Sequence, residues 1–116
     1  MKRRFRLTRS TDIKRVRRSG KSYAHPLIVL YALQTGHHVT RVCVTAGLTV
    51  GNAVHRNRAK RLLREAMNPF LPTLPPGYNL MLVGRSPLAS SSLQETSLAL
   101  SGLLRRAGLI ERKHDD

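Results

Sequence analysis

The chain contains very few cysteines, acidic residues and long apolar runs. Its one cysteine, Cys43, excludes an intrachain disulfide and favours a reducing compartment. No apolar run approaches the roughly 20 residues that are needed to span a bilayer, and the basic N-terminus lacks the apolar core of a signal peptide. We therefore expect a cytoplasmic protein without a membrane segment.

The low acidic content leaves a large positive charge on a chain of ordinary size. Only 6 Asp and Glu oppose 21 Lys and Arg, so the formal net charge is +15. The apolar fraction of 41% is that of a globular protein, which places this charge on a folded body. We expect a single domain over residues 1–116, with a basic arm at 1–7 and a frayed tail at 111–116. Because each neutralised phosphate releases counterions, nucleic acid is the expected partner.

Hydrophobic periodicity and turn residues predict six elements in the order αββαβα. This order is typical of an α+β fold, here a two-layer sandwich in which helices pack on a small mixed sheet. The expected strands are residues 27–33, 40–46 and 79–85. The glycine-containing turn between the first two predicts that they pair antiparallel as a hairpin. Four prolines exclude regular structure from residues 68–78.

Capping residues locate the three expected helices. The first is expected to begin at Ser10, capped by side chains of its first turn, and to end at Gly20. The second covers residues 53–67, and the last begins at a capping box formed by Ser92 and Glu95. The apolar face of the last helix is expected to comprise Leu93, Leu100, Leu103, Leu104 and Ala107.

The helix expected at 53–67 separates apolar from cationic side chains. At roughly 100° per residue, five apolar side chains share the side that faces the core: Ala59, Leu62, Leu63, Ala66 and Met67. Six polar side chains lie on the other side or flank it, and we call them the cationic ridge: Arg56, Asn57, Arg58, Lys60, Arg61 and Arg64. Like charges three and four residues apart repel by a few tenths of a kcal/mol per pair, so the ridge favours an anionic partner.

The ridge is suited to RNA because it combines several charges with one amide. The Asn57 amide offers a donor and an acceptor to a base edge or a 2′-hydroxyl. The alternative is a solvated charged face, which is what most charge runs form. Glu65 is the only acidic residue in this helix, so little would balance the ridge without a partner.

The run from Gly51 to Ala66, GNAVHRNRAKRLLREA, resembles the signature of the bacterial ribonuclease P protein family, an RNR core followed by KRLLRE. The order of elements agrees over nearly the whole chain. The resemblance implies a subunit of an endoribonuclease that removes the 5′ leader of precursor tRNA, with a large RNA as the main catalyst. It also implies a fold like the second domain of ribosomal protein S5, with a left-handed strand–helix–strand crossover where the general rule predicts a right-handed one.

The resemblance also assigns partners and sites. It places the catalytic RNA on the cationic ridge and the leader in a cleft between the first helix and the sheet. Family positions and nearby charge together define what we call the leader set: Arg9, Ile13, Lys14, Arg17 and Tyr31. The implied partners are the catalytic RNA and precursor tRNA, with Mg²⁺ held mainly by RNA, no catalytic residue in the protein, and a monomer outside the ribonucleoprotein.

Four positions depart from the family pattern. Ile13 and Arg17 stand where the family commonly has phenylalanine, which leaves Tyr31 as the aromatic side chain of the cleft. Stacking is worth about 1 to 3 kcal/mol per base, so leader binding is expected to depend more on charge here. Leu48 and Thr49 stand where a lysine pair is common, and we assign no phosphate contact to them.

Three other functions are alternatives to this one. A metal nuclease needs clustered carboxylates, whereas the six acidic residues are scattered and the histidines lack ligand spacing. A membrane-surface helix needs a broad exposed apolar face, but the apolar side of the central helix is needed for the core. A ribosomal or architectural nucleic-acid binder has the same composition, and only the extended signature distinguishes it.

Overall fold

Four strands form one mixed sheet in the computed structural model, which describes residues 1–111. The strands are β1 (Lys21–Ala24), β2 (Ile28–Gln34), β3 (Arg41–Ala46) and β4 (Tyr78–Gly84). The α-helices of the described residues are α1 (Ser10–Ser19), α2 (Ala53–Met67) and α3 (Leu93–Arg106). The expected frayed tail lies outside the described residues, apart from residue 111.

The strand order is β1-β2-β4-β3, which corrects one prediction. β2 pairs antiparallel with both β1 and β4, and β3 pairs parallel with β4. The expected hairpin between strands 27–33 and 40–46 is therefore wrong, because β4 lies between them. β4 buries four consecutive residues, Asn79–Leu82, so both of its faces are covered. A strand that is apolar on both faces is most stable at the centre of a sheet, and this preference outweighs the local turn signal.

β1 is a strand that the predicted order lacks. Its sequence, KSYA, is short and mostly exposed, so it shows no apolar alternation. It forms because its backbone pairs with β2 along a register from Lys21↔Ala32 to Ala24↔Val29. A short, polar edge strand of this kind also protects the edge of the sheet from pairing with other chains.

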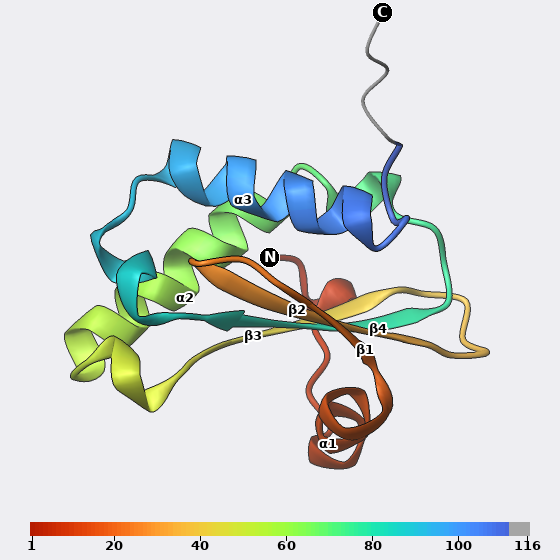
Figure 1. The fold of residues 1–116 in the computed structure, drawn as a ribbon. Coiled ribbons are helices and arrows are strands. Elements are labelled where there is room, and N and C mark those ends of the chain that lie inside the picture. Colours follow the sequence, from red (N-terminus) through yellow and green to blue (C-terminus); the bar gives the residue numbers. More distant parts are fainter. Residues whose placement is uncertain (112–116) are drawn as a thin grey trace, which may run out of the picture.

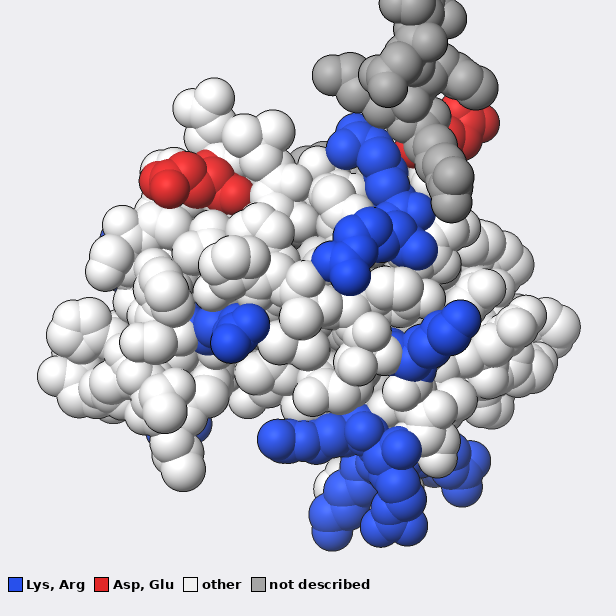
Figure 2. All heavy atoms as spheres, viewed as in Figure 1, with Lys and Arg blue, Asp and Glu red and all other residues white. Residues whose placement is uncertain are grey.

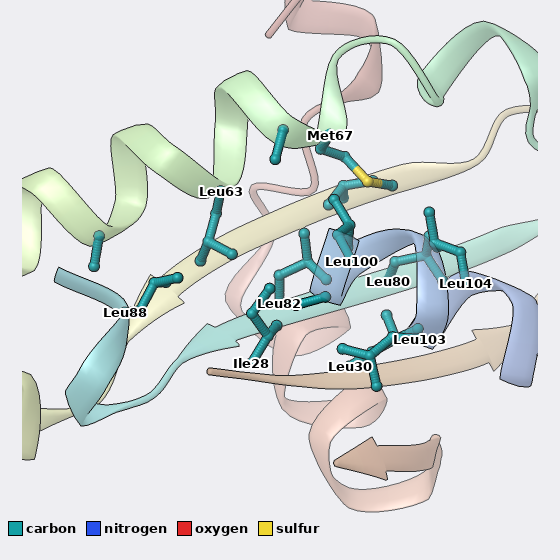
Figure 3. Close-up of a cluster of buried hydrophobic side chains, with 14 of the residues drawn as sticks. Ile28, Leu30, Leu63, Met67, Leu80, Leu82, Leu88, Leu100, Leu103 and Leu104 are labelled. Carbon is teal, nitrogen blue, oxygen red and sulfur yellow. The ribbon is translucent and has the colours of Figure 1, made fainter. Parts of the chain in front are cut away.

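Helices cover both faces of the sheet (Figure 1). α2 and α3 lie on one face, and α1 lies on the other. The larger core fills the space between the sheet and the α2–α3 layer, where Leu63 and Met67 of α2 meet Leu80 and Leu82 of β4 (Figure 3). A smaller core of Leu7, Val16 and Met81 lies beneath α1. The alternation of side chains along each strand divides the apolar residues between these two cores.

The crossover from β3 through α2 to β4 has the hand that the resemblance implies. In Figure 1 both strands run toward the left, α2 lies above the sheet, and β4 lies nearer the viewer than β3. This arrangement is left-handed, against the general rule for parallel neighbours.

The helix ends are a second test of the sequence patterns. The Ser92–Glu95 capping box of α3 is present, and Gly108 follows this helix with a φ of 74°. The expected side-chain cap of α1 is wrong: Arg9 occupies that position and makes no side-chain cap hydrogen bond.

Two further expectations of local structure are corrected. Leu93 is 44% exposed, because it occupies the first turn of α3, before the helix reaches the sheet. A single 3-10 turn, Leu71–Thr73, forms within the proline-rich segment and buries Leu71 against the larger core.

Candidate nucleic-acid interface

Burial of its apolar side fixes α2 on the sheet. The five side chains expected to face the core are all buried, with Ala59, Leu63 and Met67 fully inaccessible. Asn52 caps the N-terminus of the helix, and its side-chain oxygen accepts a hydrogen bond from the His55 backbone N–H at 3.2 Å. α2 is therefore held in one rotational setting, and the opposite side is directed outward.

The cationic ridge occupies that outward side. Asn57 and Arg61 are exposed, and Lys60 and Arg64 are half-buried at the border with the sheet. All four side chains fall within roughly 100° of helical arc, so they face one direction. A single extended polyanion can therefore contact several of them at once.

Arg56 and Arg58 flank the ridge and are held by backbone carbonyl groups. Arg56 Nη2 donates to the Ala46 carbonyl oxygen at 3.4 Å, at the end of β3. Arg58 Nε donates to the Ala89 carbonyl oxygen at 2.7 Å, in the 3-10 turn Ser86–Ser90. A carbonyl oxygen carries no net charge, so these bonds orient the guanidinium groups without neutralising them.

Three members of the leader set lie where α1 meets the sheet. The half-buried side chains of Ile13 and Tyr31 both pack against the smaller core. Arg17 is exposed one turn after Ile13 and so lies on the same side of α1. The surface between this side of α1 and the sheet therefore presents one aromatic ring, one aliphatic side chain and one cation.

The other two members of the leader set are exposed cations. Arg9 immediately precedes α1. Lys14 is rotated roughly 100° from Ile13 and lines a groove with Arg15 and Arg18 on another side of the helix. The structure therefore separates Lys14 from the side chains around Tyr31.

Sequence reasoning missed Arg15 and Arg18 as candidate site residues. Figure 2 shows Lys and Arg side chains gathered over α1, at the bottom of the view, with the acidic side chains of this face at the top. The signal was present in the sequence as cations at positions 14, 15 and 18 of one short helix. These cations line a groove only because the fold places residues 33–37 and Asn79 opposite them.

Cys43 lies beside the ridge and not in the main core. It is half-buried in the smaller core and lines a small cavity together with Arg64. Burial raises the pKa of its thiol, while the positive charge of Arg64 acts in the opposite direction. The neutral thiol is the favoured form, which suits packing and disfavours a nucleophilic role.

The described acidic side chains do not form a metal site. No group of three or more His, Cys, Asp or Glu within residues 1–111 could hold a metal ion. Asp12, Glu65 and Glu95 lie on three different helices. The same part of the chain has no helix that is both long and apolar enough to cross a membrane.

Comparison with known proteins agrees with the signature in α2. Residues 1–108 match the family model of ribonuclease P. Two relatives are ribonuclease P protein components. That of Clostridium novyi is 34% identical over 94% of this chain and 98% of its own length. That of Roseiflexus castenholzii is 32% identical over 96% of this chain and 92% of its own length.

Solved structures show the same fold. The RNase P protein of Staphylococcus aureus matches with a TM-score of 0.79 and 23% identity, over 90% of this chain and 96% of its own. The RNase P protein from Thermotoga maritima matches with a TM-score of 0.76 and 24% identity, over 92% and 98%.

Proposed function

The chain belongs to the ribonuclease P protein component family, and from this premise we propose that its cationic ridge binds the RNA of ribonuclease P. As a member of this family it is a subunit of a ribonucleoprotein nuclease that acts in tRNA processing. The proposal concerns which surface of the chain meets which RNA.

One observation carries the proposal: the ridge faces outward while the opposite side of α2 is buried. Leu63 and Ala59 are fully buried, and Asn57 and Arg61 on the opposite side are exposed. Arg56 and Arg58 extend this surface toward β3 and the 3-10 turn Ser86–Ser90. Because the helix cannot rotate without exposing its apolar side, the cations are pre-organised for an extended row of phosphates.

We further propose that the 5′ leader of precursor tRNA binds on the α1 face of the sheet. Tyr31 offers a ring for one base, and Arg9 and Arg17 offer charge to the backbone. Lys14 contributes at longer range, since it lies on another side of α1.

The chemistry of leader removal is proposed to belong to the RNA. The described carboxylates do not fit a Mg²⁺ site, so we derive no catalytic step from side chains of this protein. Mg²⁺ is proposed to bind RNA phosphates, and the protein to lower the Mg²⁺ requirement by supplying positive charge. We also propose a cytoplasmic monomer outside the ribonucleoprotein.

A cleavage assay at low Mg²⁺ tests the proposal. The chain is mixed with a bacterial ribonuclease P RNA and a precursor tRNA, and release of the 5′ leader is measured with and without protein. Stimulation is expected, because the ridge neutralises phosphates that Mg²⁺ would otherwise screen.

A ridge variant separates this function from general charge screening. Arg61→Gln combined with Asn57→Ala is expected to reduce stimulation, and Arg3→Gln, which removes the same single charge from the N-terminal arm, to retain most of it. No stimulation by the unmodified chain would favour an architectural nucleic-acid binder. Equal losses in the two variants would favour screening without a defined ridge.

A further inference from the structure

A groove of about 630 Å³ lies between α1 and the segment that ends β2. One wall is α1, with Asp12, Lys14, Arg15 and Arg18. The other wall runs from Leu33 through the turn to residue 37, and Asn79 of β4 contributes from the sheet. This volume lies within the range of about 300 to 1,000 Å³ that accommodates small organic ligands, so one nucleotide fits.

Asn79 is the most informative residue of this groove. It is only 7% exposed, lies between Leu33 and Arg41 in the sheet register, and borders the groove. Among residues 1–111, we find no hydrogen bond to its side-chain amide. The buried side-chain atoms that lack a hydrogen-bond partner within residues 1–111 do not include those of Asn79, so solvent in the groove reaches its amide, which is open to a ligand. An amide offers both donors and acceptors, as base recognition requires.

The charges of the groove favour an anionic ligand. Lys14, Arg15 and Arg18 are exposed cations along one wall, against the single carboxylate of Asp12. His37 adds an imidazole ring on the facing wall. Phosphates alone could pair with the cations. The Asn79 amide oxygen and the Asp12 carboxylate accept hydrogen bonds, so they favour a ligand that also has N–H or O–H groups.

Apart from Lys14, which belongs to the leader set and also lines the groove, the groove is separate from both surfaces of the proposed function. Arg15 is rotated roughly 200° from Ile13 around α1, so it lies on the far side of that helix from the proposed leader site. The ridge is on α2, which covers the opposite face of the sheet (Figure 1). A strand in the groove would therefore be a further RNA contact.

We propose that this groove binds a segment of single-stranded RNA, with one unstacked base against Asn79 and the sugar–phosphate backbone along Arg15, Arg18 and Lys14. RNA fits better than a simple polyanion because an extruded base satisfies the amide, and a 2′-hydroxyl or base N–H can donate to Asp12.

The test is a titration of the isotope-labelled full chain with a short oligoadenylate, followed by NMR. The side-chain amide signal of Asn79 and the backbone signals of residues 35–37 are expected to shift and saturate. Inorganic polyphosphate of equal charge is expected to leave the Asn79 side-chain signal in place. The readout needs no ribonuclease P RNA, so it stands apart from the cleavage assay.

Two matched variants decide whether the groove itself is responsible. Arg15→Gln with Arg18→Gln is expected to weaken oligoadenylate binding at the Asn79 signal by about tenfold, since two charge-assisted contacts are lost. Lys2→Gln with Arg3→Gln removes the same charge from the N-terminal arm and is expected to change it less than threefold, as general screening would.

Three outcomes would overturn the proposal. The first is an Asn79 side-chain signal that does not move when oligoadenylate saturates the chain. The second is equal weakening by the two pairs of variants. The third is an Asn79 shift with polyphosphate as large as with oligoadenylate, which would make the groove a plain anion site. Asn79→Asp adds a check where circular dichroism shows that it folds, because a carboxylate would repel the strand.

Discussion

At the scale of single residues, the structure divides the cations of α2 into two kinds. Arg61 is exposed and has no hydrogen bond to residues 1–111, so its charge is available to a partner. Arg58 also holds the Ala89 carbonyl oxygen, so its side chain serves the fold as well. Substitutions at these two positions therefore report different things, although the sequence places both in one run.

Arg61→Ala is expected to weaken binding to ribonuclease P RNA and to lower the salt dependence of log K by about one, if Arg61 meets one phosphate. Stability should change little, because surface substitutions of this kind are usually within about 0.5 kcal/mol. Binding measured over a series of salt concentrations checks this. Arg61→Lys, which keeps the charge, should keep the slope, and an unchanged slope in the alanine variant would remove Arg61 from the interface.

Tyr31→Ala is expected to reduce the preference for precursor over mature tRNA by about fivefold or more, since stacking on one base is worth about 1 to 3 kcal/mol. Binding to ribonuclease P RNA alone should be nearly unchanged. Tyr31→Phe retains the ring and should retain the preference. Because Tyr31 packs on the smaller core, thermal unfolding is measured in parallel. Equal losses for both RNAs would mean that the ring acts only in packing.

At the scale of elements, the position of α1 relative to the sheet defines both the proposed leader site and the groove. Gly20 sets this position. A Cβ atom there would lie 2.4 Å from the Val16 carbonyl oxygen and 3.1 Å from that of Ala32 in β2. Its φ of −73° is open to any residue, so glycine is required by space and not by backbone conformation. Helix and strand approach more closely here than a side chain permits.

Gly20→Ala is expected to destabilise the fold by about 1 to 3 kcal/mol, because both obstructing atoms belong to the backbone and α1 must shift. Gly102→Ala in α3 is the matched control. A Cβ there meets nothing within 4 Å, so the higher helix propensity of alanine should raise stability by up to about 1 kcal/mol. Chemical denaturation measures both, and equal effects would contradict the close approach at Gly20.

At the scale of the whole molecule, the charge of +15 opposes the compact state. Cations lie on α1, on α2 and in the N-terminal arm, so a large part of the surface repels itself. Anions that bind the folded chain relieve this repulsion and stabilise the fold by mass action.

Millimolar sulfate is therefore expected to raise the thermal midpoint of the free chain above its value in chloride of equal ionic strength. A divalent anion bridges neighbouring cations on the ridge and in the groove, which general screening by chloride does not reproduce. Circular dichroism in the two salts is the measurement. Identical midpoints would mean that the folded surface has no specific affinity for anions.

The sequence by itself determined α2, the cationic ridge on it and the RNR signature, because helical periodicity and capping act over neighbouring residues. It also determined the start of α3, because the Ser92–Glu95 capping box forms within a single turn. Only the tertiary structure decided that β4 lies between β2 and β3, that β1 joins the edge, and that Lys14 faces away from Tyr31. It likewise brought Asn79 to the cations of α1. These features depend on pairings between residues far apart in the chain, where the burial of β4 on both faces outweighs the local signals of the turn.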